Sequence, residues 1–176
     1  VLKKMSKRAG NVILLRDLVE EFGIDVVRWF FNEKALSTQM AFDMALARDA
    51  SDKNPVYYVQ YAHARLVAIA EKARVLAEAA DTQSFKNLMA VPSARALASK
   101  IIEFPEVVSD VARDYTVQAI TTYATALAQC SNAFYRDVRV ITDDGYNGVA
   151  LALSLRAKET LIQTLNLLGI SSPDKM

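Results

Sequence analysis

The chain has 176 residues, 52% of them hydrophobic, with only 5 glycines and 4 prolines, a composition typical of a packed globular protein and not of a disordered or collagen-like one. No apolar run approaches the roughly 18 residues needed to span a bilayer, which excludes a transmembrane helix. The net charge is +1, but residues 1–17 carry +4 and the remainder therefore −3, so bulk positive charge cannot attach the larger part of the chain to nucleic acid.

The first third of the chain predicts two short helices. Residues 11–14 (NVIL) are compatible with a strand. Apolar residues then recur at helical spacing over 15–22, and Gly23 follows where a C-terminal cap would stand. Asp25 is the expected N-cap of the next helix. The large apolar side chains of that helix are expected in the core: Val26, Trp29, Phe30 and Phe31.

A boundary between two domains is predicted where the chain becomes polar and unpatterned. This run, DASDKN, occupies residues 49–54. The segment 32–54 is expected to be irregular apart from a short helical piece near 42–48. The prediction is therefore a connecting subdomain over 1–53 and a larger domain over 54–176.

The larger domain predicts an all-α helical bundle. Asn54-Pro55 is a helix-start signal, because asparagine caps the first turn and proline is tolerated at the first helical position. The helix that starts there should run to about residue 79. A polar linker over 79–87, helices near 93–103, 105–113, 117–138 and 149–168, and a loop over 142–148 are expected to follow.

The helix that begins at Pro55 carries two stripes of side chains, because a helix advances about 100° per residue. Tyr58, Tyr61 and Arg65 form a ridge at +3 and +4 spacing. Two phenol rings and a guanidinium near a helix N-terminus make a candidate surface for stacking nucleobases. The alternative is that the tyrosines are boundary residues, packed by the ring and wetted by the hydroxyl. The neighbouring stripe is assigned to the core: Val59, Ala62, Leu66, Ala70 and Ala73.

Other residues give little sign of catalysis. His63, the only histidine, lies nearer the core stripe and is expected to be packed and hydrogen-bonded. The sequence shows no Cys/His cluster with metal-ligand spacing and no glycine-rich phosphate loop of Rossmann or Walker type. Cys130 is expected to be buried and inert. Because a single cysteine cannot form an internal disulfide, a reducing, cytoplasmic location is expected.

The basic stretch KKMSKRAG at residues 3–10 is the remaining motif. Lysines at the edge of a glycine-containing loop suit a polyphosphate, because their mobile charge can follow negative charge as it shifts during phosphoryl or nucleotidyl transfer. Ordinary solvated lysine clusters are also common. The stretch therefore needs a second motif before it indicates a function.

Read together, three motifs resemble the arginyl-tRNA synthetase family of class I aminoacyl-tRNA synthetases. KMSKRAGN at residues 4–11 resembles the KMSKS signature loop, with Arg8 in its last position. NPVYYVQYAHAR at 54–65 resembles the start of the family's anticodon-binding helical domain. LRAKETLIQTLNLLGISSPDKM at 155–176 is similar to the family's C-terminus, so the resemblance covers essentially the whole chain.

The resemblance implies functional residues in both halves of the chain. In the loop, Lys4 and Lys7 would be catalytic, and Lys7 would stabilise the transition state as arginine attacks the α-phosphate of ATP. The loop residues implied to bind ATP are Lys4, Met5, Ser6 and Lys7. The residues implied to bind the tRNA anticodon are Tyr58, Tyr61, Arg65, Tyr135 and Met176.

The resemblance also implies a reaction, in which arginine, ATP with Mg²⁺ and tRNA-Arg give arginyl-tRNA. The family's nucleotide-binding fold lies upstream of the signature loop, so the chain is expected to be a fragment that is inactive and cofactor-free by itself. A monomer without membrane contact is expected. Two alternatives stay open: a helical adapter that binds another protein through the tyrosine ridge, and the equivalent piece of another class I synthetase, such as the cysteinyl or methionyl enzyme.

Overall fold

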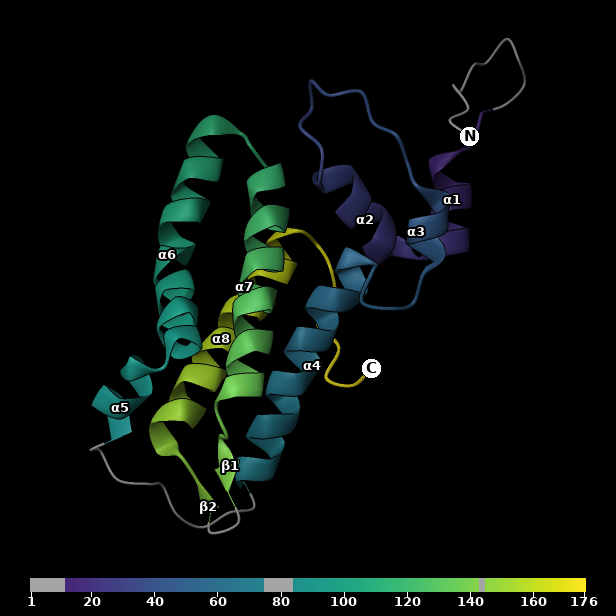
Figure 1. Cartoon of the computed structure of the whole chain (residues 1–176). Coiled ribbons are helices and arrows are strands. Elements are labelled where there is room, and N and C mark those ends of the chain that lie inside the picture. The colour runs from purple at the N-terminus through teal and green to yellow at the C-terminus, as the bar shows by residue number, and fades with distance from the viewer. Residues whose placement is uncertain (1–11, 75–83, 143–144) are drawn as a thin grey trace.

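Helices make up all but one short ladder of the secondary structure in the part of the chain that the computed structural model describes, residues 12–74, 84–142 and 145–176. This confirms the all-α prediction. The four long helices are α4 (Pro55–Arg74), α6 (Pro92–Asp114), α7 (Gln118–Asp137) and α8 (Gly148–Leu167). In Figure 1, α4 and α7 run in one direction through the main body, and α6 and α8 run in the opposite direction.

Helix α4 begins at Pro55, as predicted, because Asn54 fixes its first turn. The Asn54 side-chain oxygen accepts a hydrogen bond from the Val56 backbone N–H at 3.1 Å, and its Nδ2 donates to the Ala47 carbonyl at 3.3 Å. Asn54 is fully buried, so both halves of its amide need these partners. The helix is thereby tied to α3 (Met44–Arg48).

The predicted core stripe of α4 is buried at four of its five positions, and Ala70 is half-buried. The described helix ends at Arg74, so its predicted continuation to residue 79 lies outside the described residues.

The N-terminal segment differs from the prediction in two places, residues 12–14 and the N-cap of the second helix. Residues 12–14 are not a strand, since no strand among the described residues lies beside them to pair with. They lead into α1 (Leu15–Phe22), where the Asp17 carboxylate accepts from the Leu14 N–H at 3.3 Å. Gly23, with φ of +81°, ends α1 and is also the N-cap of α2 (Ile24–Asn32), so Asp25 is not the cap.

The aromatic side of α2 divides between the core and the surface. Trp29 and Phe30 are buried as predicted, together with Val26, but Phe31 is 44% exposed. Consecutive residues turn by about 100° on a helix, so three adjacent aromatic rings cannot all face the same core. The Phe31 ring instead lies 6.4 Å from the ring of Phe42, centroid to centroid.

Helix α6 is continuous, whereas the sequence analysis divided it into two helices at Pro105. The proline lies inside the helix on an exposed face, where losing one backbone hydrogen bond is tolerated. A further difference is α5 (Ser84–Ala90), which occupies part of the predicted linker. The predicted loop over 142–148 contains most of a short ladder, in which β1 (Ile141–Thr142) pairs antiparallel with β2 (Gly145–Tyr146).

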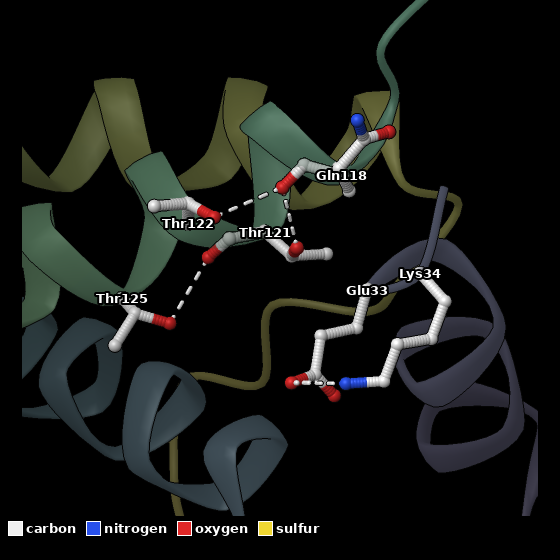
Figure 2. A network of polar contacts seen from close by, with 6 residues as sticks. All are labelled: Glu33, Lys34, Gln118, Thr121, Thr122 and Thr125. Carbon is white, nitrogen blue, oxygen red and sulfur yellow. Dashed lines mark hydrogen bonds and ion pairs between the residues drawn. The ribbon is translucent and has the colours of Figure 1, made fainter. Parts of the chain in front are cut away.

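Figure 2 shows how the start of α7 carries polar side chains next to α2. The hydroxyls of Thr121 and Thr122 both donate to the Gln118 carbonyl, at 2.8 and 3.1 Å, and Thr125 donates to the Thr121 carbonyl at 3.0 Å. In the same view Glu33, at the end of α2, forms an ion pair with the lysine that follows it. Because its hydroxyl is satisfied inside α7, Thr121 is buried without needing a partner from α2.

One apolar core joins α2 to the bundle, and it contains side chains from all four long helices. The division into 1–53 and 54–176 stays a prediction. The largest side chains that are almost completely buried include Trp29, Leu66, Leu97, Leu127, Phe134, Leu161, Leu165 and Ile170.

We expect Pro105→Ala to raise the free energy of unfolding by about 1–3 kcal/mol, because it restores a helical N–H in the middle of α6 and removes the clash with the preceding turn. Urea unfolding followed by circular dichroism measures the change. Pro92→Ala is the matched control, since Pro92 lies at the start of the same helix, where its missing N–H costs nothing. A destabilised Pro105→Ala variant would contradict a continuous α6.

Candidate nucleic-acid interface

Arg65 is the centre of a cluster that joins α4 to α7. Its Cζ lies 4.4 Å from the centroid of the Tyr61 ring and 5.1 Å from that of Tyr135. Its Nη1 donates to the Asn132 side-chain oxygen at 3.0 Å, and its Nη2 donates to the Tyr61 hydroxyl at 3.4 Å. A guanidinium held against two phenol rings gains cation–π attraction from both. The structure therefore brings together three residues predicted at different places in the sequence.

The two phenol rings of this cluster are accessible to a ligand. Tyr61 is 45% exposed and Tyr135 is 46% exposed, so part of each ring remains open for stacking on a flat partner. Tyr58 differs, because it is half-buried and packs against the core. The predicted ridge thus consists of the exposed Tyr61 and the half-buried Arg65, continued on α7 by the exposed Tyr135, while Tyr58 packs against the core.

The C-terminal tail after α8 is held by polar contacts from α2 and α4. The buried Gln60 donates through Nε2 to the Asp25 carboxylate and to the Ser171 carbonyl, both at 3.0 Å. Asp25 also accepts from the Ser171 backbone N–H at 3.2 Å and from the Ser171 hydroxyl. Arg28 donates to the Gly169 carbonyl. The tail is thereby joined to two elements that are far away in the sequence.

Met176, at the end of this tail, is 53% exposed. The tail runs back along α4 from the end of α8 (Figure 1). On α4 the tail is held by Gln60 and His63, whereas Arg65 contacts Asn132 of α7. The structure therefore does not bring Met176 into the Arg65 cluster through the contacts that hold the tail.

His63 is fully buried and holds the tail in place, as expected for a packed histidine. Its Nδ1 lies 3.0 Å from the Pro173 carbonyl, which can only accept, so Nδ1 carries the proton and Nε2 the lone pair. Nε2 has no hydrogen-bond partner within the described part of the chain. Burial lowers the pKa of His63 below its usual 6.5, and the Pro173 carbonyl partly opposes this.

Two hollows lie away from the tyrosines. The larger, of about 390 Å³, is an open groove between α6 and α8, lined by Phe104, Val108, Gln163, Asn166 and Leu167. The smaller, of about 140 Å³, lies beside His63, and Lys158 and Asp174 are among its lining residues. Neither of these two hollows is lined by a residue of the Arg65 cluster.

The remaining predictions concern the signature loop, Cys130, metal sites and membrane-spanning helices. Lys4, Met5, Ser6 and Lys7 lie outside the described residues. Cys130 is half-buried and not fully buried, and burial raises the pKa of its thiol, which keeps it protonated and unreactive. In the described ranges, no three His, Cys, Asp or Glu side chains gather as a metal site, and no helix is long and apolar enough to cross a membrane.

Two sets of residues were not predicted from the sequence: one holds the Arg65 cluster and the other holds the C-terminal tail. Asn132 precedes Tyr135 by three positions, so the two share a face of α7, and this spacing could have identified it. Asp25, Gln60 and Ser171 gave no local signal, because their contacts join segments more than 30 residues apart.

The sequence model of the DALR anticodon binding domain matches residues 59–176, and the chain belongs to this family. It is 40% identical to Arginine–tRNA ligase 1 of Halalkalibacterium halodurans over 175 residues and 41% identical to the Arginine–tRNA ligase of Geotalea daltonii over 177 residues. These alignments cover 98% of this chain but 32% and 31% of the relatives, so the chain spans about a third of their length.

The fold is similar to that of the Thermus thermophilus arginyl-tRNA synthetase, with a TM-score of 0.71 and 27% sequence identity. That comparison covers 97% of this chain and 29% of the other. Together with the curated relatives, it confirms the resemblance to the arginyl-tRNA synthetase family that the sequence motifs indicated.

We expect Gln60→Ala to lower the free energy of unfolding by about 1–3 kcal/mol, since it removes the amide that links the Ser171 carbonyl to Asp25. Urea unfolding measures the loss. The matched control is Gln163→Ala, because Gln163 is exposed on α8 and its removal leaves the tail contacts intact. Equal unfolding midpoints for the two variants would contradict a stabilising role of Gln60.

The depressed pKa of His63 predicts a pH dependence. Below pH 6.5 the unfolded chain binds a proton at this histidine more readily than the folded chain, so the stability contributed by neutral His63 is fully present above that pH and is lost as the pH falls. Urea midpoints for the wild type and His63→Gln, taken from about pH 7.5 to about pH 5.5, measure the slope. The variant should show the smaller slope, and identical slopes would refute the assignment to His63.

Proposed function

We propose that this chain is the anticodon-binding part of an arginine–tRNA ligase, together with a segment that connects it to the catalytic region. The parent reaction would join arginine to tRNA-Arg with ATP, releasing AMP and pyrophosphate. Residues 54–176 would bind the anticodon, and residues 1–53 would carry the signature loop and its support. The family match over 59–176 and the arginine–tRNA ligase relatives support this proposal.

The observation that carries the proposal is the guanidinium of Arg65 held against two exposed phenol rings. Anticodon bases that leave the loop stack can lie on Tyr61 and Tyr135, and stacking on an aromatic side chain is worth roughly 1–3 kcal/mol per base. Arg65 can donate hydrogen bonds to a base edge or a phosphate. Tyr58 would support the surface from its deeper position, and Met176 is assigned to anticodon binding by the family resemblance.

Binding of ATP with Mg²⁺ in the parent enzyme is assigned to the loop residues Lys4, Met5, Ser6 and Lys7. In this proposal Lys4 and Lys7 supply positive charge beside the triphosphate, and Lys7 stabilises the pentacovalent α-phosphorus as pyrophosphate leaves. Because the chain spans about a third of its relatives' length, we expect it to bind no ATP and to aminoacylate no tRNA by itself. A monomeric, cytoplasmic parent without membrane contact completes the proposal.

The test is a titration of the 176-residue chain with tRNA-Arg and with a non-cognate tRNA at two salt concentrations. We expect tighter binding of tRNA-Arg at both concentrations, because stacking and specific hydrogen bonds are less sensitive to salt than phosphate contacts are. Indistinguishable affinities for the two tRNAs would overturn anticodon recognition and favour the helical adapter.

Within this proposal, Tyr61→Ala and Tyr135→Ala should each weaken binding of tRNA-Arg about fivefold to a hundredfold, through the loss of one stacking platform. Equilibrium binding measures the change, and circular dichroism checks that helix content is kept. Tyr115→Ala is the matched control, since Tyr115 is 80% exposed and caps the end of α6 before α7 begins, whereas Tyr135 lies near the end of α7. Lost helicity in either variant would show that its tyrosine is structural.

A further inference from the structure

We propose that Asn132 is a positioning residue of this interface. Its side chain holds the Arg65 guanidinium in place between α4 and α7, so that the N–H groups at the edge of the guanidinium face a nucleotide. The inference rests on the proposed function and deepens it. Asn132 is half-buried on α7, and its side-chain oxygen accepts from Arg65 Nη1 at 3.0 Å.

Arg65 needs a positioning partner because its side chain is long and its ring contacts are weakly directional. A free arginine side chain has many rotamers, and their entropy is lost when the side chain is fixed. The two phenol rings attract the guanidinium but allow it to slide or rotate over them. Hydrogen bonds do fix orientation, because they depend on angle as well as distance. The bond to Asn132, at 3.0 Å, is the stronger of the two that Arg65 forms, since the bond to the Tyr61 hydroxyl is 3.4 Å long.

The neutral charge of Asn132 matters as much as its position. Arg65 forms no salt bridge within the described residues, whereas Arg48, Arg113, Arg136 and Arg156 each pair with a carboxylate. An asparagine oxygen orients a guanidinium without cancelling its charge. Arg65 therefore presents a full positive charge at an exposed aromatic surface.

The same contacts define what Arg65 can recognise. A guanidinium has five N–H donors and no acceptor, and the hydrogen bonds to Asn132 and Tyr61 use two of them. The Tyr61 and Tyr135 ring centroids lie 4.4 and 5.1 Å from its central carbon. Because the N–H bonds of a planar guanidinium lie in its plane, a nucleotide meets the remaining donors at the edge. The partner must then be an acceptor, either the oxygen and ring-nitrogen edge of a base or a phosphate oxygen.

The first test needs no RNA. In the free chain the ring currents of Tyr61 and Tyr135 should shift the NMR resonances of the Arg65 side chain upfield. Asn132→Ala should reduce this shift, and Asn166→Ala should not. Asn166 is the matched control because it is exposed on α8, in the groove away from the tyrosines. An unchanged Arg65 shift in Asn132→Ala would overturn the inference without touching the proposed function.

The second test measures binding of the tRNA-Arg anticodon stem-loop to Asn132→Ala, Arg65→Ala and the double variant. Asn132→Ala should weaken binding about twofold to tenfold in the wild-type background and should have no further effect in the Arg65→Ala background. Equal losses in both backgrounds would show that Asn132 does not act through Arg65. No specific binding by the wild-type chain would overturn the proposed function and this inference together.

The acceptor that Arg65 meets can be identified in the same series. If it is a phosphate, Arg65→Ala should reduce the slope of log affinity against log salt by about one. If it is a base edge, Arg65→Ala and Asn132→Ala should lose discrimination at one anticodon position when each base is changed in turn. Uniform losses at every position with an unchanged salt slope would overturn the role of Arg65 as an edge donor.

Discussion

The packing of α4 is the constraint on which the rest of the structure depends. Ten of its 20 residues are buried, because α7, α8 and the C-terminal tail all pack against it, and α2 lies at its start. A helix covered by so many neighbours has only a narrow strip of its surface exposed to solvent. Tyr61 and Arg65 occupy that strip on the side of α7, so the packing that forms the core also decides where a ligand can touch α4.

The polar residues buried on α4 follow from the same constraint. Gln60 and His63 lie on faces that the tail covers, and burying an amide or an imidazole without a partner would cost free energy. The tail supplies the Ser171 and Pro173 carbonyls as those partners. Because Asp25 of α2 joins the same network, the tail, the bundle and the N-terminal segment are fixed relative to one another.

Local sequence signals predicted the helices well where one rule decided the outcome. Asn54-Pro55 gave the start of α4, and helical spacing gave most of its core stripe. The failures lie where two rules compete: a proline in a long helix with an apolar face did not end α6, and adjacent aromatic residues on α2 could not all be buried. Residues 12–14 have the composition of a strand, but no strand in the described ranges lies beside them to pair with.

The candidate site could be predicted in part, namely where spacing along a single helix was sufficient. Spacing along α4 identified Tyr61 and Arg65, and the resemblance added Tyr135. Spacing along α7 places Asn132 on the same face as Tyr135, but sequence alone could not show that Asn132 contacts Arg65, since this depends on how two helices are rotated against each other. The depth of Tyr58 depends on the same rotation. Contacts between segments distant in the sequence become visible only in three dimensions.

The charge of the chain explains why the contact between Asn132 and Arg65 would matter. Outside its first 17 residues the chain is net negative, so a polyanion approaching the bundle meets no general attraction. Affinity must then come from a few groups whose charge is not cancelled and whose position is fixed in advance, because a preorganised side chain loses less entropy on binding. A guanidinium with an amide as its partner meets both conditions, and a carboxylate in place of Asn132 would meet only the second.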